Sequence, residues 1–93
     1  MARSRKSLRS TKVFEREFAW WQKSFGAVVK EQRLEAKLSR RELAKRAKFS
    51  IATLVHIEQG HGNPMLNSME NLAIALGTRL SRLFELTQNR ERR

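Results

Sequence analysis

Residues 38–60 of the chain read LSRRELAKRAKFSIATLVHIEQG, and the first half of this stretch contains a clear helix-start signal. Ser39 and Glu42 have the Ser-x-x-Glu spacing of a capping box. In this motif the hydroxyl accepts a hydrogen bond from the backbone near the glutamate, and the carboxylate reaches back to the cap residue. Apolar residues follow directly, so a short helix is expected over 40–47.

The second half of the same stretch predicts another short helix. Ser50 has the character of an N-cap, and two glycines and Pro64 prevent a long continuation. This helix is expected over 51–59, and a Lys-Phe-Ser segment separates it from the preceding one. Two capped helices joined by so short a turn have the spacing of a helix-turn-helix, here over 39–59.

Aromatic residues dominate the segment that precedes this motif. Phe14, Phe18, Trp21 and Phe25 recur at spacings of four, three and four residues, which places them on one stripe of a helix. The pattern predicts an amphipathic aromatic helix over 13–24.

Three further helices are predicted from apolar periodicity, over 25–37, 66–76 and 80–86. Leu34 and Leu66 are expected to be buried on the inner faces of the first two. Gly26 leaves open whether the helix that begins at residue 25 is continuous with the aromatic one. No segment alternates with the period of a strand. The predicted fold is therefore all-α, a compact five-helix domain over 25–86 with an additional N-terminal aromatic helix.

Charge is concentrated in separate parts of the chain. There are 20 Lys and Arg against 9 acidic residues, a formal net charge of +11, which points first to nucleic acid and second to an anionic membrane surface or acidic partner. Residues 37–48 form one basic cluster and residues 87–93 a basic tail, whereas no Lys or Arg occurs over 49–78. Residues 1–12 form a flexible basic arm that is expected to contact phosphates through Arg3, Arg5, Lys6, Arg9 and Lys12.

Composition also argues against several classes of protein. The chain has no Cys, so it lacks disulfides and thiolate metal sites, and its apolar runs are too short to cross a bilayer. We therefore expect a cytoplasmic protein without membrane partners or cofactors. His56 and His61 do not share a helix face, so no metal site is expected. No nucleophile–base set can be assembled, which argues against an enzyme.

Residues 25–86 resemble the lambda-repressor-like, or XRE-type (Cro-type), helix-turn-helix family. The resemblance rests on LSRRELAKRAKFSIATLVHIEQGHGNP and LNSMENLAIALGTRLSRLFEL. The small Ala44, the apolar Phe49, Leu54 and Ile57, and the IEQG…NP pattern stand where that family has them. The resemblance implies that residues 51–59 form a recognition helix that enters the major groove of DNA.

The implied DNA-binding residues lie on and around this recognition helix. Projection at 100° per residue turns Ser50, Leu54, Ile57 and Glu58 inward, and the opposite side outward. Small apolar side chains on the outward side can contact thymine methyl groups, and an imidazole can bond a base edge. The candidate DNA contacts are Ser39, Arg40, Arg41, Ser50, Ile51, Ala52, Thr53, Val55, His56, Gln59, His61 and Asn63.

The family pattern also implies structural roles for charged residues. Arg33 and Glu58 match a pair that forms an ion pair between helices, which would hold the fold together. Lys37 and Lys48 replace family glycines, and a left-handed backbone at either lysine would cost about 1 kcal/mol relative to glycine. Arg40 stands where the family commonly has Gln, and phosphate contact is the expected role of its side chain.

Three functions are compatible with these observations. The first is a sequence-specific regulator that binds double-stranded DNA, a repressor acting as a homodimer, because one short helix reads few base pairs. The second is an antitoxin that regulates its own promoter and binds a toxin through another surface, and the third is a nucleic-acid-binding module without sequence preference. Candidate dimer or partner contacts are Phe14, Phe18, Trp20, Trp21, Leu83 and Phe84.

Overall fold

The computed structural model describes residues 11–90, and over this range the chain forms five α-helices and no strand. The all-α prediction is therefore confirmed. Most of the predicted basic arm and the last three residues of the predicted tail, 1–10 and 91–93, lie outside the described residues. The helices are α2 (Thr11–Glu35), α3 (Arg40–Ala47), α4 (Ile51–Glu58), α5 (Leu66–Ala75) and α6 (Leu80–Gln88).

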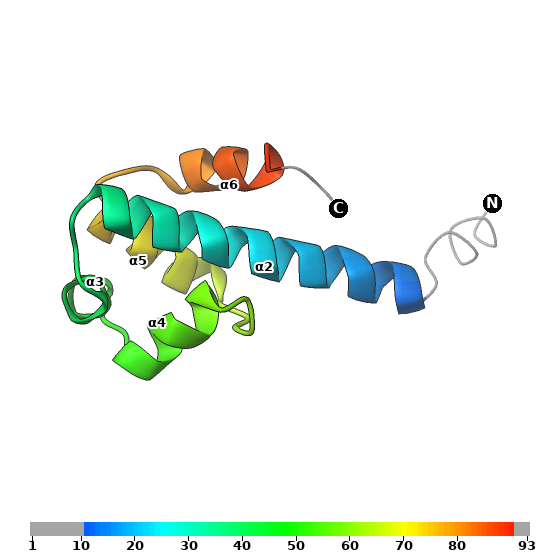
Figure 1. Cartoon of the computed structure of the whole chain (residues 1–93), viewed down its shortest axis with the longest axis horizontal. Coiled ribbons are helices and arrows are strands. Elements are labelled where there is room, and N and C mark those ends of the chain that lie inside the picture. Colours follow the sequence, from blue (N-terminus) through cyan, green and yellow to red (C-terminus); the bar gives the residue numbers. More distant parts are fainter. Residues whose placement is uncertain (1–10, 91–93) are drawn as a thin grey trace.

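The aromatic segment is not a separate helix. Residues 13–24 and 25–35 belong to the single 25-residue helix α2, which continues through Gly26 without a break. Helix α2 packs against α4 and α6, and its N-terminal part extends beyond the other helices (Figure 1). The glycine that raised the question of continuity is buried, and it lies against the C-terminal end of α4.

The core is made by one apolar face of each helix. Leu34 and Leu66 were predicted to be buried, but they are exposed. On α2 the inward side carries Val29 and Arg33, and the next position, Leu34, is turned by about 100° away from it. Leu66 lies in the first turn of α5, whose inward side is set by later residues. The buried hydrophobic residues are Phe25, Val28, Val29, Leu38, Leu43, Ala44, Ala47, Leu54, Ile57, Leu72, Ala73 and Leu83.

The last helix extends further into the predicted tail than the sequence pattern indicated. Thr87 is fully buried in α6, and its hydroxyl donates to the carbonyl of Leu83 at 2.7 Å. Leu83 is itself fully buried, so it belongs to the core and is excluded as a dimer contact. Arg90 pairs with Glu31 of α2 at 2.7 Å, which ties the end of α6 to the first described helix.

Both lysines that replace family glycines adopt the left-handed backbone. Lys37 has a φ of 58° and Lys48 a φ of 64°. Lys48 follows α3 directly, and its amide donates to carbonyls of the last turn of that helix. The turn of the helix-turn-helix therefore has a left-handed residue after α3, as the family pattern implies. Because that residue is Lys48 and not glycine, its backbone is sterically strained.

We expect Lys48→Gly to stabilise the protein by about 1 kcal/mol, because glycine adopts this backbone without the steric cost that a Cβ imposes. For a domain of this size the melting temperature should rise by roughly 4–8 °C. Thermal unfolding followed by circular dichroism measures the change. Lys48→Ala is the matched control, since it removes the same charge but keeps the Cβ. An equal gain in both variants would assign the effect to charge.

Candidate nucleic-acid interface

Reciprocal hydrogen bonds fix the N-terminus of α3. The Ser39 hydroxyl accepts from the backbone amide of Glu42 at 3.0 Å, and the Ser39 amide donates to the Glu42 carboxylate at 2.8 Å. These bonds from Ser39, with a smaller contribution from the nearby charge of Arg46, hold the pKa of Glu42 below its usual value. The capping box is thus present, and it leaves Arg40 and Arg41 at the start of the helix with exposed side chains.

Helix α4 is fixed by a similar cap and by its buried side. The Ser50 hydroxyl accepts from the amide of Thr53 at 3.0 Å. Leu54, Ile57 and Glu58 are buried, as the helical projection predicted. Ser50 was also predicted to point inward but is exposed, because a cap residue lies outside the helical repeat and its hydroxyl turns to the first turn.

The opposite side of α4 forms an exposed surface without Lys or Arg. We call Ile51, Ala52, Thr53, His56 and Gln59 the α4 surface; all five are exposed. Val55 is half-buried beside them, and His61 and Asn63 are exposed in the loop that follows. Several of these residues line a hollow of about 320 Å³ between α4, the following loop and α5. Its lining residues are Ala52, Thr53, His56, Ile57, Gly62, Asn63, Pro64 and Ser68.

Basic residues lie on the outward side of the neighbouring helix. Arg41 and Lys45 are exposed on α3, and Lys48 is exposed at its C-terminal end. Arg41 and Lys45 are four residues apart and so lie on the same side of α3, away from the buried Leu43 and Ala47, and Lys48 caps the C-terminal end of the helix. Because α3 packs against α4, an uncharged helix surface and a row of cations belong to the same two-helix unit.

A buried carboxylate connects three helices beneath this unit. Arg33 of α2 donates to Glu58 through two nitrogens, at 2.7 and 3.2 Å, and to the carbonyl of Leu38 at 3.0 Å. Arg40 also donates to Glu58, at 3.0 Å. The expectation that Arg40 is simply a solvent-facing phosphate ligand is thus incomplete. Sequence reasoning missed this contact because only the packing of α3 on α4 brings positions 40 and 58 together.

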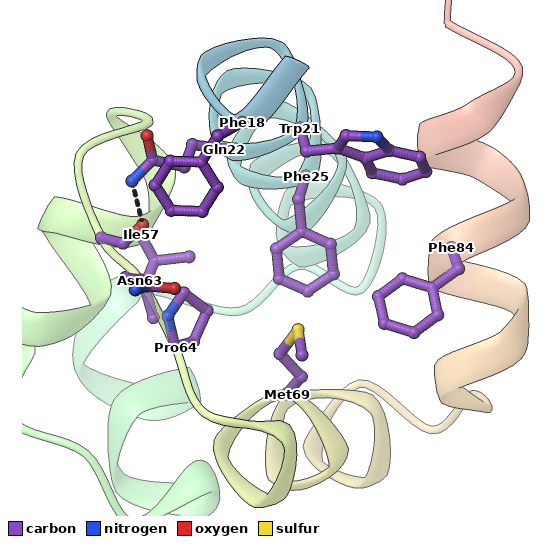
Figure 2. A pocket seen from close by; sticks show the side chains of 10 residues that line it. Phe18, Trp21, Gln22, Phe25, Ile57, Asn63, Pro64, Met69 and Phe84 are labelled. Atoms are coloured by element: carbon purple, nitrogen blue, oxygen red, sulfur yellow. Dashed lines mark hydrogen bonds between the residues drawn. The ribbon is translucent and has the colours of Figure 1, made fainter. Parts of the chain in front are cut away.

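The aromatic residues of α2 differ in exposure along the helix. Phe14 and Phe18 are 56% and 49% exposed, whereas Phe25 is buried. Trp20 and Trp21 are half-buried, and their rings pack edge to face with 5.0 Å between the ring centroids. Part of this stripe lines an apolar pocket of about 190 Å³ between α2, α5, α6 and the loop after α4 (Figure 2).

Two of the pocket residues, Gln22 and Phe84, make contacts between different segments of the fold. The amide of Gln22 donates to the carbonyl of Gly62 at 2.7 Å, which ties this loop to α2 (Figure 2). Phe84 is half-buried and packs near Phe25, with 6.0 Å between ring centroids.

Residues 11–90 contain neither a membrane-spanning helix nor a cluster of metal-ligating side chains. No helix in this range is long and apolar enough to span a bilayer. Nor do three or more His, Asp or Glu side chains gather there in a group that could hold a metal ion.

The fold is all-helical, and α3 and α4 are two capped helices joined by a short turn. Helix α4 presents an exposed surface without Lys or Arg beside the basic residues of α3. These features are those of the helix-turn-helix class of DNA-binding transcriptional regulators. A family model described as helix-turn-helix matches residues 29–83, more than half of the chain. The chain therefore belongs to the lambda-repressor-like, or XRE-type, helix-turn-helix family. Among curated proteins, none matches it.

Solved structures with the same fold include two bacterial regulators. The restriction-modification controller protein C.AhdI from Aeromonas hydrophila is 28% identical, with a TM-score of 0.67, and the match covers 68% of this chain and 96% of that one. The clp gene regulator ClgR from Corynebacterium glutamicum is 20% identical, with a TM-score of 0.71 and coverage of 73% and 72%. At that identity, the likeness to ClgR concerns the fold alone.

Proposed function

We propose that the protein is a sequence-specific transcriptional repressor that binds double-stranded DNA, with α4 inserted in the major groove. The observation that carries this proposal is the exposed α4 surface, which has no Lys or Arg although the chain has a net charge of +11. A surface that only attracted phosphates would carry cations. An uncharged helix surface flanked by cations suits the floor of a groove between two phosphate ridges.

Base recognition would rest on apolar contacts and on one imidazole. Ile51 and Ala52 in the first turn of α4 can contact thymine methyl groups, and His56, one turn further along, can bond a base edge. Because the α4 surface offers few bidentate donors, the shape and deformability of the DNA should contribute to specificity.

Affinity would come from the cations around α4. Arg40 and Arg41 stand at the start of α3, whose free backbone amides also suit a phosphate oxygen. The basic residues of the 1–12 segment would add attraction that salt screens. The basic residues of this segment would contact phosphates and not bases.

We also propose that the protein binds DNA as a homodimer, because a helix of eight residues reads only a few base pairs. Phe14 and Phe18 support this, since both side chains are about half exposed in the N-terminal part of α2, at 56% and 49%. A dimer would bind two half-sites separated by about one helical turn, or a multiple of it.

Selection of bound duplexes from a random pool tests the proposal. We expect an enriched, two-fold symmetric motif that binds at least about 1,000-fold more tightly than a scrambled duplex at the same salt concentration. Equal affinity for both duplexes would identify a module without sequence preference. Purification of the protein from its own cells is a second experiment. If a toxin-like protein co-purified in stoichiometric amounts, the protein would be an antitoxin.

A further inference from the structure

Glu58 occupies an unusual electrostatic position at the C-terminal end of α4. Its side chain is 1% exposed, and it accepts hydrogen bonds from two guanidinium groups on different helices. The side chain of Arg33 is only 7% exposed. Its guanidinium donates a bidentate pair of hydrogen bonds to the Glu58 carboxylate and a further one to the backbone carbonyl of Leu38. This first pair already balances the buried carboxylate, so stability alone does not require the second cation.

The second cation, Arg40, differs from the first in exposure and in the nitrogen it uses. Its side chain is 45% exposed, and it contacts Glu58 through Nε at 3.0 Å. Within residues 11–90 no acceptor contacts its two terminal nitrogens. The guanidinium is therefore held by its inner nitrogen while its outer edge, with four N–H donors, faces solvent.

We propose that Glu58 is a positioning residue for DNA binding, which holds Arg40 so that the outer edge of its guanidinium receives a phosphate oxygen beside the groove. This inference rests on the proposed function. The carboxylate belongs to α4, so the phosphate contact and the α4 surface are fixed relative to each other through one side chain. A guanidinium that is already ordered loses less side-chain freedom on binding, and a bidentate contact to phosphate gains from that order.

Only arginine can perform this double role. A lysine at position 40 carries the same charge, but its single ammonium is a point donor that cannot present a planar fork to phosphate while it stays bonded to the carboxylate. Arg41, the neighbouring residue, is exposed and forms no ion pair among residues 11–90. Arginine and lysine should therefore be nearly equivalent at position 41 but not at position 40.

This difference provides a charge-neutral test with the full chain and the selected duplex. Dissociation constants are measured over a range of salt concentrations for Arg40→Lys, Arg41→Lys and Arg40→Ala. We expect Arg40→Lys to bind about ten-fold more weakly with an unchanged salt slope, and Arg41→Lys to stay within about two-fold of the parent. Arg40→Ala should bind more weakly still and lose about one unit of slope.

The outcomes separate this inference from the proposed function. If Arg40→Lys binds as the parent does while Arg40→Ala is weakened, Arg40 contacts DNA only as a charge, and the positioning role of Glu58 is wrong. If Arg40→Ala leaves both affinity and slope unchanged, the inference is also wrong. In that case the sequence selectivity of the parent decides whether the proposed function survives.

A double-mutant cycle tests whether Glu58 acts through Arg40. In the parent background we expect Glu58→Gln to weaken DNA binding several-fold, measured well below the melting temperature. In the Arg40→Ala background the same change should have no further effect on affinity. A purely structural role would weaken both backgrounds equally and would overturn the inference. The single variant Arg40→Lys decides the matter if Glu58→Gln does not fold.

Discussion

Gly26→Ala should destabilise the protein by about 2 kcal/mol, although alanine is the better helix former by about 1 kcal/mol. A Cβ at this position would overlap the backbone carbonyl oxygen of Ile57 in α4. That oxygen already accepts a hydrogen bond from the amide of Gly60 at 3.0 Å, and it belongs to rigid backbone that cannot turn aside as a flexible side chain could. To admit the methyl group, α2 and α4 must move apart, and the buried contacts between them are then lost.

The sign of the effect makes this experiment informative. At an exposed site in the middle of a helix, replacement of glycine by alanine raises the free energy of unfolding; here we expect the melting temperature to fall by roughly 10 °C. Thermal and urea unfolding both measure the change. An unchanged or higher melting temperature would show that α2 and α4 do not approach as closely as the structure indicates.

Gly77→Ala is the matched control for this substitution. Gly77 has a φ of 73°, but a Cβ added there would have no neighbour within 4 Å. Alanine should therefore cost only the conformational strain of a left-handed residue, about 1 kcal/mol. A larger loss at Gly26 than at Gly77 would separate the helix contact from backbone strain.

Local signals predicted the helix-turn-helix well, because its boundaries are set by side chains that cap their own helices. Helix α3 has the expected bounds, and α4 begins where the position of Ser50 indicated. The capping box at Ser39 needs only residues within one turn, so a sequence pattern is sufficient to find it. The inward positions of α4 followed from the helical repeat for the same reason.

Features that depend on packing between helices could not be predicted in this way. Gly26 has the same local signal whether it breaks a helix or lets another helix approach, and the distinction depends on where α4 lies. Leu34 was predicted to be buried because it is apolar, yet Arg33 takes the inward position to reach Glu58. The contact of Arg40 with Glu58 spans 18 residues and has no periodic signature.

The candidate interface was predicted in its residues but not in its internal connections. Exposure of Ala52 and His56 agrees with the position expected for a surface that meets DNA, and their contacts with bases stay a prediction. Leu83 shows the opposite case. Leu83 was a candidate dimer contact as an apolar residue of the last predicted helix, but α6 packs on α2 and α5, and its side chain is fully buried. Phe14 and Phe18 remain as the exposed candidates for subunit contact.

Ala52→Asp should abolish specific DNA binding while the protein stays folded. Ala52 is exposed in the first turn of α4, so a larger side chain there meets no atom of the core. A carboxylate near a helix N-terminus interacts favourably with the helix dipole, by about 0.3–1 kcal/mol. The free energy of unfolding should therefore be unchanged or slightly raised, and any loss of binding belongs to the interface.

The expected loss of affinity is about 100-fold or more, because the new charge would be desolvated against base edges and between phosphates of the same sign. Ala19→Asp is the matched control: it gives the same net charge at an exposed position on α2, in the hollow that Arg90 lines. We expect this control to lose only a few-fold, and that loss should disappear at high salt. Equal affinities for the two variants, measured on the selected duplex, would mean that α4 does not enter the groove. Another exposed surface of the chain would then have to contact the DNA.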